Sequence, residues 1–446
     1  MRSLALLAGS WLAAGGASAQ TPEPATPSES LLGELLISGS AEIKLTPLAI
    51  LPSFSPEFED VVVRSVVRRD FELTGMFKVI PDDKAPPGSY AFDDPVDIKA
   101  WRKLGAEVIV KLAAQKQGDQ IKIFGLAYFE NAGPKPVYEK TFLVNSADVR
   151  VTAHRITDAL LGAITGRNGG FASHLTFAAR SGKNTSIYSI DADGQNIRVQ
   201  SDPNDTAIAP FWGPNAQLFF SRSRKYGPFQ LLVVGKDQPV SVPFKGSVYS
   251  AAFSLDYQRL AVAVAENLGS AVYVGAPDGT GMKKVSQNEV ATHPVFSPSG
   301  KIAWIGGGDK NTGQRVYVEG KAVSPAGFSA AAPTFCDTED GVLLVYAVGV
   351  GGGGQDLVMS NERGGNMARL TQGQGSNSYP ACSPDGRLIS YFSKRGDKEQ
   401  GLFIKSLKNW QSLKISNHHG ESLRWAALPP VDTKEIPAVP RPVAAP

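Results

Sequence analysis

The chain has 446 residues, of which 42% are hydrophobic and 20% charged, a composition typical of globular proteins with two or three domains. Its net charge of +3 at pH 7 is too small to favour nucleic acid as a partner, and no block of lysine and arginine is interleaved with aromatic residues. The 46 glycines and 31 prolines indicate many tight turns, and therefore a body rich in β-structure.

The N-terminal segment has the features of a secretory signal peptide. Arg2 supplies the positive charge, a short apolar run follows it, and an A-x-A cleavage site ends at Ala19. We expect residues 1–19 to be removed and the mature protein to be exported. An uncleaved membrane anchor is the alternative, but this run is too short to cross a bilayer. No later run reaches about eighteen apolar residues, so no membrane-spanning segment is expected.

Residues 20–40 are expected to form a flexible linker and an N-terminal arm. The linker, "QTPEPATPSES", is rich in Pro, Ser and Thr and has almost no apolar content. The run "LLGELLISGS" at 31–40 fits either an edge strand or a detachable arm held by a few contacts. We expect no core to depend on it, so that deletion of residues 20–37 leaves folding intact.

The pattern from 41 to 168 predicts one compact α/β domain. Apolar residues at helical spacing predict a helix that ends near Leu73, and a long helix that begins at Asn145 or Ser146 and ends at Gly166. A buried strand is expected before the first of these helices, and a short helix and three strands are expected between them. The expected ranges are 47–54, 97–105, 106–115, 120–130 and 136–144.

From residue 171 onward the chain repeats one pattern of short alternating strands. Corresponding anchor residues recur at intervals of 39 to 47 residues, and an aromatic residue stands two positions later in five of the six copies. Four strands in about 43 residues is the period of a β-propeller blade, whereas a solenoid has shorter repeats and a sandwich has no constant period. The anchors are Pro210, Ala251, Pro294, Pro333, Pro380 and Leu423.

The two ends of the repeat region predict how the ring closes. The first copy lacks its first strand, and "ESLRWAAL" at 421–428 is a first strand with nothing after it. Together they complete a six-bladed propeller over 171–428 and remove a free sheet edge. Deletion of this strand is expected to unfold the propeller. Residues 429–446 form a proline-rich tail that we expect not to join a sheet.

The chain has two cysteines, Cys336 and Cys382. An exported protein could join them in a disulfide. They stand one residue out of phase in neighbouring repeats, however, so their side chains should point to opposite strand faces. We therefore favour two separate buried thiols, and the spacing does not fit a zinc site.

Several short motifs fit turns better than chemistry. "SPSG" at 297–300 and "SPDG" at 383–386 fit turns between first and second strands. "DADG" at 191–194 fits a hairpin turn, because the positions of a calcium loop that need Gly and Glu hold other residues. The glycine-rich 306–310 and 349–354 lack the ending of a phosphate loop and are interpreted as flexible rim loops.

No catalytic motif of the nucleophile-elbow, H-E-x-x-H or C-x-x-C type occurs, so we expect no enzyme activity, no cofactor and no metal. His154 lies on a predicted helix and is expected to be a surface or packed residue. His293, His418 and His419 precede first strands, where loops line one mouth of a propeller. Protein contact is a better interpretation of these three than metal binding.

The ordered combination of arm, α/β domain and propeller resembles the TolB family of the Tol–Pal system of Gram-negative bacteria. The similarity covers about 32–428. It is carried by "PLAILPSF", "FELTGMFKVI" and "LGAEVIVK" in the N-terminal domain. In the blades it is carried by "ARSGKNTSIYSIDADGQNIRV", "PVFSPSGKIAWI" and "YPACSPDGRLISYFS".

The resemblance implies a non-enzymatic periplasmic scaffold. In that family one mouth of the propeller binds Pal, the peptidoglycan-associated lipoprotein of the outer membrane. The N-terminal arm binds TolA of the inner-membrane complex, and docking of the arm is linked to Pal binding. The system supports outer-membrane integrity and cell division. We expect the same two partners here, and a monomer.

The resemblance also implies site residues. The arm residues are Leu32, Leu35, Leu36 and Ile37. The mouth residues map to loops before first strands: Tyr249, Ser250, Thr292, His293, Ser378, Tyr379 and Glu421. Thr292 stands in the register of a family contact position, two before the anchor proline, and the others are chosen by loop position alone.

Two other functions remain open from the sequence. A hydrolase of the prolyl-oligopeptidase type would need a further α/β domain with a nucleophile elbow, and the residues after 428 are too few for one. A carbohydrate-binding or sensor propeller of the periplasm is the stronger alternative. The turn motif is degenerate in several blades, and the fifth blade is long. These departures weaken the assignment of family roles to single residues more than they weaken the resemblance to the family itself.

Overall fold

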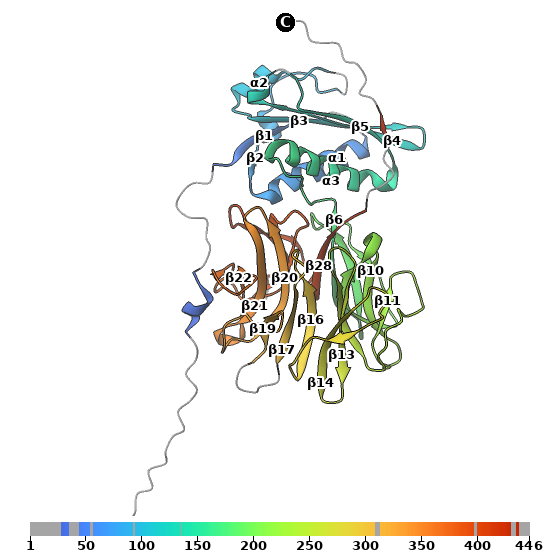
Figure 1. Cartoon of the computed structure of the whole chain (residues 1–446). Coiled ribbons are helices and arrows are strands. Elements are labelled where there is room, and N and C mark those ends of the chain that lie inside the picture. Colours follow the sequence, from blue (N-terminus) through green and yellow to red (C-terminus); the bar gives the residue numbers. More distant parts are fainter. Residues whose placement is uncertain are drawn as a thin grey trace, which may run out of the picture.

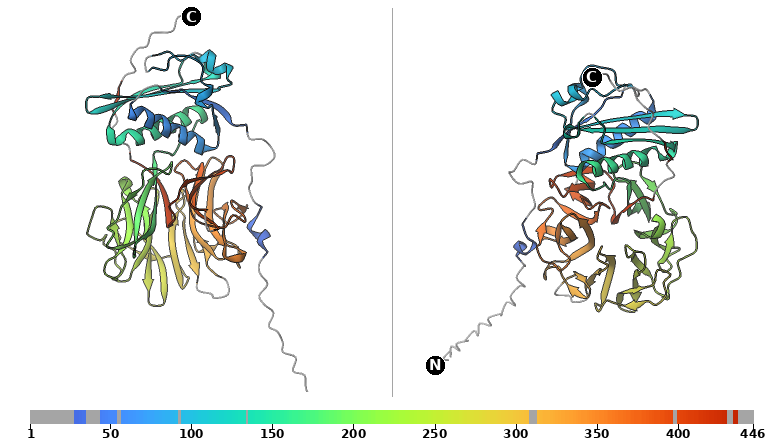
Figure 2. Two further views of the ribbon diagram at one scale, coloured as in Figure 1. Left: turned by 180° about the vertical axis from the view of Figure 1, so that it is seen from behind. Right: turned by 45° about the horizontal axis from the view of Figure 1, so that its top comes forward.

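The structure, a computed structural model, describes residues 28–34, 44–53, 57–91, 94–133, 135–307, 313–396, 399–429 and 434–436. The expected signal peptide, most of the linker, and Leu35, Leu36 and Ile37 lie outside these ranges. An α/β domain lies over one face of a β-propeller (Figures 1 and 2). Among the described helices, none is long and apolar enough to cross a membrane.

The α/β domain is built on one mixed sheet in the order β2-β1-β3-β4-β5-β29. Strand β1 pairs in parallel with β2 and β3, and the remaining pairs are antiparallel. The strands are β1 (Thr46–Ile50), β2 (Phe77–Val79), β3 (Val108–Gln117), β4 (Gln120–Phe129), β5 (Tyr138–Asn145) and β29 (Lys434–Ile436). The predicted central strands of the domain are all present.

Two long helices fill the space between this sheet and the propeller (Figure 1). Helix α1 (Phe58–Thr74) and helix α3 (Val149–Thr165) bury their apolar faces in one cluster with the sheet. Both helices end at a glycine in the left-handed conformation, Gly75 (φ 65°) and the predicted Gly166 (φ 81°). The short helix α2 (Ile98–Lys103) covers the other face of the sheet, where Trp101 is buried.

Short 3-10 helices complete the described helical structure. They are η1 (Glu29–Leu32), η2 (Asp82–Lys84), η3 (Glu130–Ala132), η4 (Ser146–Asp148), η5 (Pro214–Ala216) and η6 (Gly351–Gly353). Helix η4 leads into α3, so the long helix begins a turn later than expected.

The proline-rich tail does join a sheet, which corrects the expectation. Strand β29 pairs antiparallel with β5, and Glu435 forms an ion pair with Lys140 at 3.0 Å. Proline excludes a segment from the middle of a sheet, but 431–436 contains none. The strand lies at the edge, where only one side needs hydrogen-bond donors.

The propeller has six blades around a ring, as expected (Figure 2). The first blade has β28 (Glu421–Ala427), β6 (Ser173–Ser181), β7 (Asn184–Asp191) and β8 (Arg198–Val199), and the second has β9 (Thr206–Trp212), β10 (Leu218–Ser223) and β11 (Gln230–Val233). The third has β12 (Val248–Phe253), β13 (Leu260–Glu266), β14 (Gly269–Gly275) and β15 (Lys283–Lys284), and the fourth has β16 (Val290–Phe296), β17 (Ile302–Gly307), β18 (Arg315–Val318) and β19 (Lys321–Ala322). The fifth has β20 (Ala330–Thr338), β21 (Gly341–Gly349), β22 (Gln355–Asn361) and β23 (Ala368–Arg369), and the sixth has β24 (Ser376–Cys382), β25 (Leu388–Arg395), β26 (Glu399–Ser406) and β27 (Ser412–Ser416).

The ring closes as predicted. Strand β28 pairs antiparallel with β6 and supplies the inner strand of the first blade. The indole of Trp425 on β28 donates a hydrogen bond to the hydroxyl of Ser173 at 2.7 Å, so side chains reinforce the closure. The first and last parts of the propeller sequence thereby share one sheet, which leaves no free inner edge at the seam.

Every inner strand carries a β-bulge near its anchor residue, at the same place in five blades and one position earlier in the third. In five of them the residue before the anchor position has a positive φ of 48° to 54°: Ala209, His293, Ala332, Tyr379 and Ser422. A bulge leaves one residue without a ladder partner and changes the direction of its side chain. These bulges therefore set the direction of the side chains at the start of the inner strands.

Cys336 and Cys382 form a disulfide, which corrects the prediction of separate thiols. Their Cα atoms are 5.3 Å apart, and Cys336 is fully buried between the fifth and sixth blades. The two side chains do leave opposite faces of equivalent strands. Adjacent blades stack face to face, however, so the front of one blade meets the back of the next, and opposite orientation brings the sulfur atoms together.

Candidate functional site

The predicted mouth lies on the propeller face away from the α/β domain. The turn after the inner strand β24 contacts that domain, because the guanidinium of Arg387 donates to the carbonyl of Asn168 and the hydroxyl of Thr165, both at 2.8 Å. Arg167 donates likewise to the carbonyl of Asp337 near the end of β20. The inner strands therefore end at the α/β domain and begin at the opposite, open face.

The structure places all seven predicted mouth residues at the start of inner strands. Tyr249 is 37% exposed and Glu421 is exposed, whereas Ser250 is buried. The other four are half-buried: Thr292, His293, Ser378 and Tyr379. The mouth thus combines an exposed rim with side chains that extend inward from it.

Hydrogen bonds connect neighbouring blades at this mouth. The backbone N–H of His293 on the fourth blade donates to the hydroxyl of Ser250 on the third at 3.2 Å. The imidazole Nδ1 of His293 lies 3.0 Å from the hydroxyl of Thr292. Burial, together with the positive charge of Arg424, lowers the pKa of His293 to about 4. His293 is therefore a neutral hydrogen-bonding group at neutral pH.

Arg424 is the mouth residue that sequence reasoning missed. It lies on the closing strand β28, and its guanidinium donates to the carbonyl of Leu423 at 3.0 Å. Its charge acts on Tyr379 of the sixth blade and on His293 of the fourth. The guanidinium of Arg424 therefore lies within electrostatic range of side chains from two other blades.

A comparison of the repeats could have found Arg424. It stands one position after the anchor, where the other five inner strands have Phe211, Ala252, Val295, Thr334 and Ala381. None of those residues is charged. An arginine at a position that the repeat otherwise fills with uncharged residues is a departure that needs a local reason.

The N-terminal arm is docked on the side of the fifth blade. Residues 28–34 begin with helix η1, which Ser28 caps by accepting a hydrogen bond from the N–H of Ser30. Leu32 is 0% exposed and belongs to an apolar cluster with residues of the fourth and fifth blades, including Phe328 and Tyr346. The expectation that no core depends on the arm is therefore wrong for Leu32.

Polar contacts hold the same segment of the arm. The side chain of Arg369, 2% exposed, donates to the carboxylate of Glu29 at 2.8 Å, and its backbone N–H donates to the carbonyl of Glu34 at 2.8 Å. Gly33 has φ 79°, and a β-carbon there would collide with the carbonyl of Met367. The described part of the arm is thus a short helical turn with specific partners rather than an edge strand.

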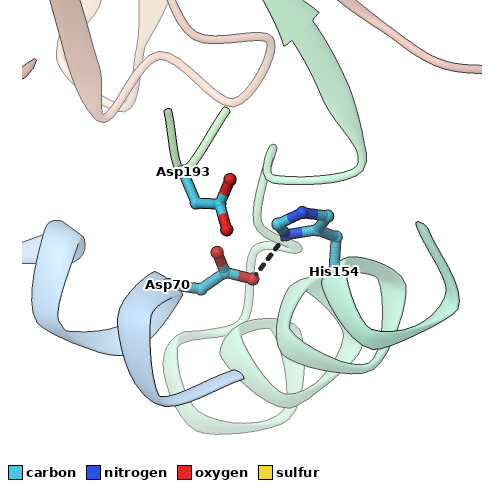
Figure 3. A group of neighbouring side chains, drawn as sticks. All are labelled: Asp70, His154 and Asp193. Atoms are coloured by element: carbon cyan, nitrogen blue, oxygen red, sulfur yellow. Dashed lines mark hydrogen bonds and ion pairs between the residues drawn. The ribbon is translucent and has the colours of Figure 1, made fainter. Parts of the chain in front are cut away.

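A buried ionic group joins the two domains (Figure 3). His154 on α3, 2% exposed, lies with its Nδ1 atom 2.8 Å from the carboxylate of Asp70 on α1. Arg150 forms ion pairs with Asp191 (2.9 Å) and Asp193 (2.7 Å), which belong to the hairpin turn at 191–194 in the first blade. The "DADG" turn is therefore a hairpin turn, as expected, and its carboxylates bind the α/β domain.

Two cationic side chains, Arg150 and His154, face three carboxylates in this group, and burial raises the pKa of one of them, Asp70. Asp70, His154 and Asp193 offer ligand atoms within 4.8 Å of one another, a spacing that could surround a cation. Attraction to these carboxylates nevertheless outweighs burial and raises the pKa of His154 to about 9, so the imidazolium supplies positive charge beside Arg150. The arrangement is that of an ionic contact between domains.

Family models match both domains. The model described as the TolB amino-terminal domain matches residues 36–125, and that of the TolB beta propeller domain matches 161–426. The chain belongs to the TolB family. A crystal structure of TolB from Acinetobacter baumannii matches with a TM-score of 0.71 and 17% identity over 86% of this chain and 97% of that one. It shows the same fold as this TolB-family chain.

Curated TolB relatives match over parts of their length. The Tol-Pal system protein TolB of Syntrophotalea carbinolica is 28% identical over 184 residues, which are 40% of this chain and 41% of the relative. That of Anaeromyxobacter sp. strain K is 26% identical over 262 residues, 57% and 60% of the two chains. The matches span less than two thirds of these TolB relatives.

Proposed function

We propose that this protein is a non-enzymatic periplasmic scaffold of the Tol–Pal system. It binds a Pal-type outer-membrane lipoprotein at the propeller mouth and a TolA-type inner-membrane protein through its N-terminal arm. In this role it supports outer-membrane integrity and cell division. The observation that carries the proposal is a docked arm on a chain whose two domains both match the TolB family.

The mouth suits a preformed protein-binding face. Its residues lie on rigid inner strands, and the hydrogen bond from His293 to Ser250 fixes the blades relative to one another. A partner that binds such a face loses little conformational entropy on the propeller side. The exposed Tyr249 and the half-buried Tyr379 offer aromatic surface of the kind that is enriched in protein interfaces.

The arm suits a reversible exchange. Its described contacts with the propeller are the buried side chain of Leu32, an ion pair from the buried Arg369 to the half-exposed carboxylate of Glu29, and a backbone hydrogen bond from Arg369 to Glu34. A segment held by so few contacts can leave its own propeller and bind a partner in their place. Any ligand that favours one of the two arm states must, by linkage, have its own affinity changed by the arm.

The disulfide agrees with a periplasmic location. Structural disulfides form and persist in oxidising compartments, of which the bacterial periplasm is one. The disulfide between Cys336 and Cys382 connects adjacent blades, and Cys336 is fully buried. An exported protein with an expected cleaved signal peptide would meet the oxidising conditions that this bond needs.

A calorimetric titration tests the proposal. The mature protein is titrated with the soluble domain of Pal from the same organism, beside a Tyr379→Ala, Thr292→Ala double variant. Tyr257→Ala is the matched control, because its 40% exposed ring lies in the turn after β12, on the opposite face of the propeller. Binding that only the double variant weakens supports the proposed mouth. Absence of binding by the wild type would refute the Pal assignment and favour a glycan-binding or sensor role.

A further inference from the structure

A cavity of about 540 Å³ lies between the α/β domain and the first blade of the propeller. Its walls come from the first turns of α1 and α3, the start of β6, the hairpin after β7 and the residues that follow β28. This volume is in the range of sites that hold small organic molecules, about 300–1,000 Å³. The cavity is on the side of the propeller that faces the α/β domain, away from the mouth, and the proposed scaffold function does not use it.

The wall formed by α3 is cationic. Arg150 and His154 are one helical turn apart on the face of α3 that lines the cavity. The guanidinium of Arg150 donates through Nε and Nη2 to Asp191 and Asp193, and no described residue accepts a hydrogen bond from its Nη1 atom. Arg198 on β8 adds an exposed guanidinium. The first turn of α3 lies at the same wall, so the positive end of the helix dipole adds to these charges.

His154 supplies the observation that points to a ligand. Its Nδ1 atom points toward Asp70 (Figure 3), but its Nε2 atom is buried and has no hydrogen-bond partner among the described residues. A carboxylate oxygen of Asp191 lies 4.0 Å from Nε2, which is too far for a hydrogen bond. The imidazolium form of His154 predominates at neutral pH, so Nε2 carries a proton that lacks an acceptor. An anionic acceptor in the cavity would reduce the cost of this buried donor.

The wall formed by α1 and by the residues after β28 is mainly apolar. Phe58 and Val62 are one helical turn apart on α1, and Leu428 and Pro429 follow β28. The side chain of Phe58 is 75% exposed. An apolar ligand would cover surface that this wall leaves in water, and removal of such surface from water is favourable.

We infer that this cavity binds a small monocarboxylate with an apolar body. The carboxylate lies against α3, where Arg150 and His154 donate to it, and the apolar part packs against Phe58. Glu59 and Asp148 also line the cavity, and their carboxylates disfavour a second negative charge on the ligand. Because both domains line the cavity, the ligand holds them together. This inference does not rest on the proposed function.

Calorimetry with hydrocinnamate tests the chemistry of the ligand. This probe joins a phenyl ring to a single carboxylate, hydrocinnamamide is its uncharged counterpart, and phenylsuccinate is a dianion with the same ring. We expect the mature protein to bind hydrocinnamate about tenfold or more tightly than hydrocinnamamide, because the amide cannot form a charge-assisted pair with α3. Phenylsuccinate should also bind more weakly than hydrocinnamate. Equal binding of the acid and the amide would refute the carboxylate site.

Nuclear magnetic resonance of the histidine side chains locates the bound probe. The chain has five histidines, so isotope-labelled histidine gives few signals, and His154→Gln identifies those of His154. Hydrocinnamate should shift the Nε2 signal of His154. The signals of His293, His418 and His419 are the internal control, because these residues lie at or just before the inner strands, at the mouth, and should not shift.

A matched pair of variants on α1 tests the cavity without altering the ionic group. Val62 lines the cavity, whereas the neighbouring Val61 does not line it and is 54% exposed. Val62→Trp should fill part of the cavity and weaken hydrocinnamate binding about tenfold or more, while Val61→Trp should bind as the wild type does. Thermal melts establish that both variants fold.

The outcomes are distinct. Binding that shifts the His154 signal and is weakened by Val62→Trp alone supports the inference. Binding that leaves both unaffected places the probe elsewhere and overturns it. If hydrocinnamate does not bind, the cavity holds solvent alone and the inference is also overturned. The titration with Pal remains a separate test, so the proposed function stands or falls independently of this cavity.

Discussion

Docking of the N-terminal arm should depend on Leu32. Full burial of a leucine side chain contributes about 1.5–3 kcal/mol, and Leu32 is 0% exposed. Leu32→Ala should therefore weaken docking by about 2 kcal/mol, which shifts the ratio of docked to free arm roughly thirtyfold. The matched control is Leu31→Ala, because Leu31 is in the same helical turn but is 57% exposed, so its loss should leave docking unchanged.

Hydrogen exchange measures this shift directly. The backbone N–H of Arg369 donates to the carbonyl of Glu34, so its exchange requires the arm to leave. We expect this amide to exchange about thirtyfold faster in Leu32→Ala, while amides of the inner strands keep their wild-type rates. TolA is proposed to bind the free arm. The affinity of Leu32→Ala for the soluble domain of TolA should therefore exceed that of the wild type, because apparent affinity scales with the fraction of molecules whose arm is free.

The alternative is that Leu32 is a permanent part of the propeller core. In that case Leu32→Ala would leave a cavity and lower the free energy of global unfolding by about 2.7–5 kcal/mol, while the Arg369 amide stayed protected. Such a result would refute the reversible exchange. A small effect on global unfolding together with fast exchange at Arg369 would support it.

Three further predictions concern stability. The pKa of His154 in the folded protein, about 9, is above the ordinary value of 6.5. The contribution of this group to the free energy of unfolding is therefore complete below pH 6.5 and is lost as pH rises through 9. Urea titrations should show a loss of up to about 3 kcal/mol over this range, and His154→Gln should remove the pH dependence. Cys336→Ser should lower the free energy of unfolding by about 2–4 kcal/mol, and two titratable thiols in the unreduced, unfolded wild type would contradict the disulfide. Deletion of 421–428 should abolish the cooperative thermal transition, and a native-like melt would show another mode of closure.

The fold could be predicted because its signals are local. Strand alternation, turn residues and a constant period are properties of short segments, and the unpaired first strand at 421–428 predicted the closure with β6. The prediction for the tail was wrong because it rested on the overall proline content of 429–446. A strand needs only a short stretch without proline. Lys434–Ile436 provides that stretch.

The errors at the site concern contacts between units. The disulfide depends on how neighbouring blades stack, which the strand pattern does not show. The one-residue phase difference between Cys336 and Cys382 therefore led to the wrong prediction that the two thiols are separate. The docking of Leu32 requires a surface formed by blades far along the chain. Arg424 was different, because a comparison of the six inner strands shows it as the one charged residue at its position.

The apolar cluster that holds Leu32 includes neighbours of mouth residues, which offers a physical basis for the proposed exchange. Leu32 packs in the same cluster as Val295 on β16 and Ile305 on β17. Ile305 is the cross-strand partner of Thr292, and Val295 follows the bulge at His293. A partner that moves the start of β16 would alter the packing that holds Leu32. Since linkage is reciprocal, Leu32→Ala should change Pal affinity by up to the factor by which Pal changes the docking of the arm, and by that full factor where the variant frees an arm that is docked in the wild type. Equal Pal affinities of wild type and variant, with the arm shown to be free in the variant by exchange at Arg369, would mean that the two surfaces act independently.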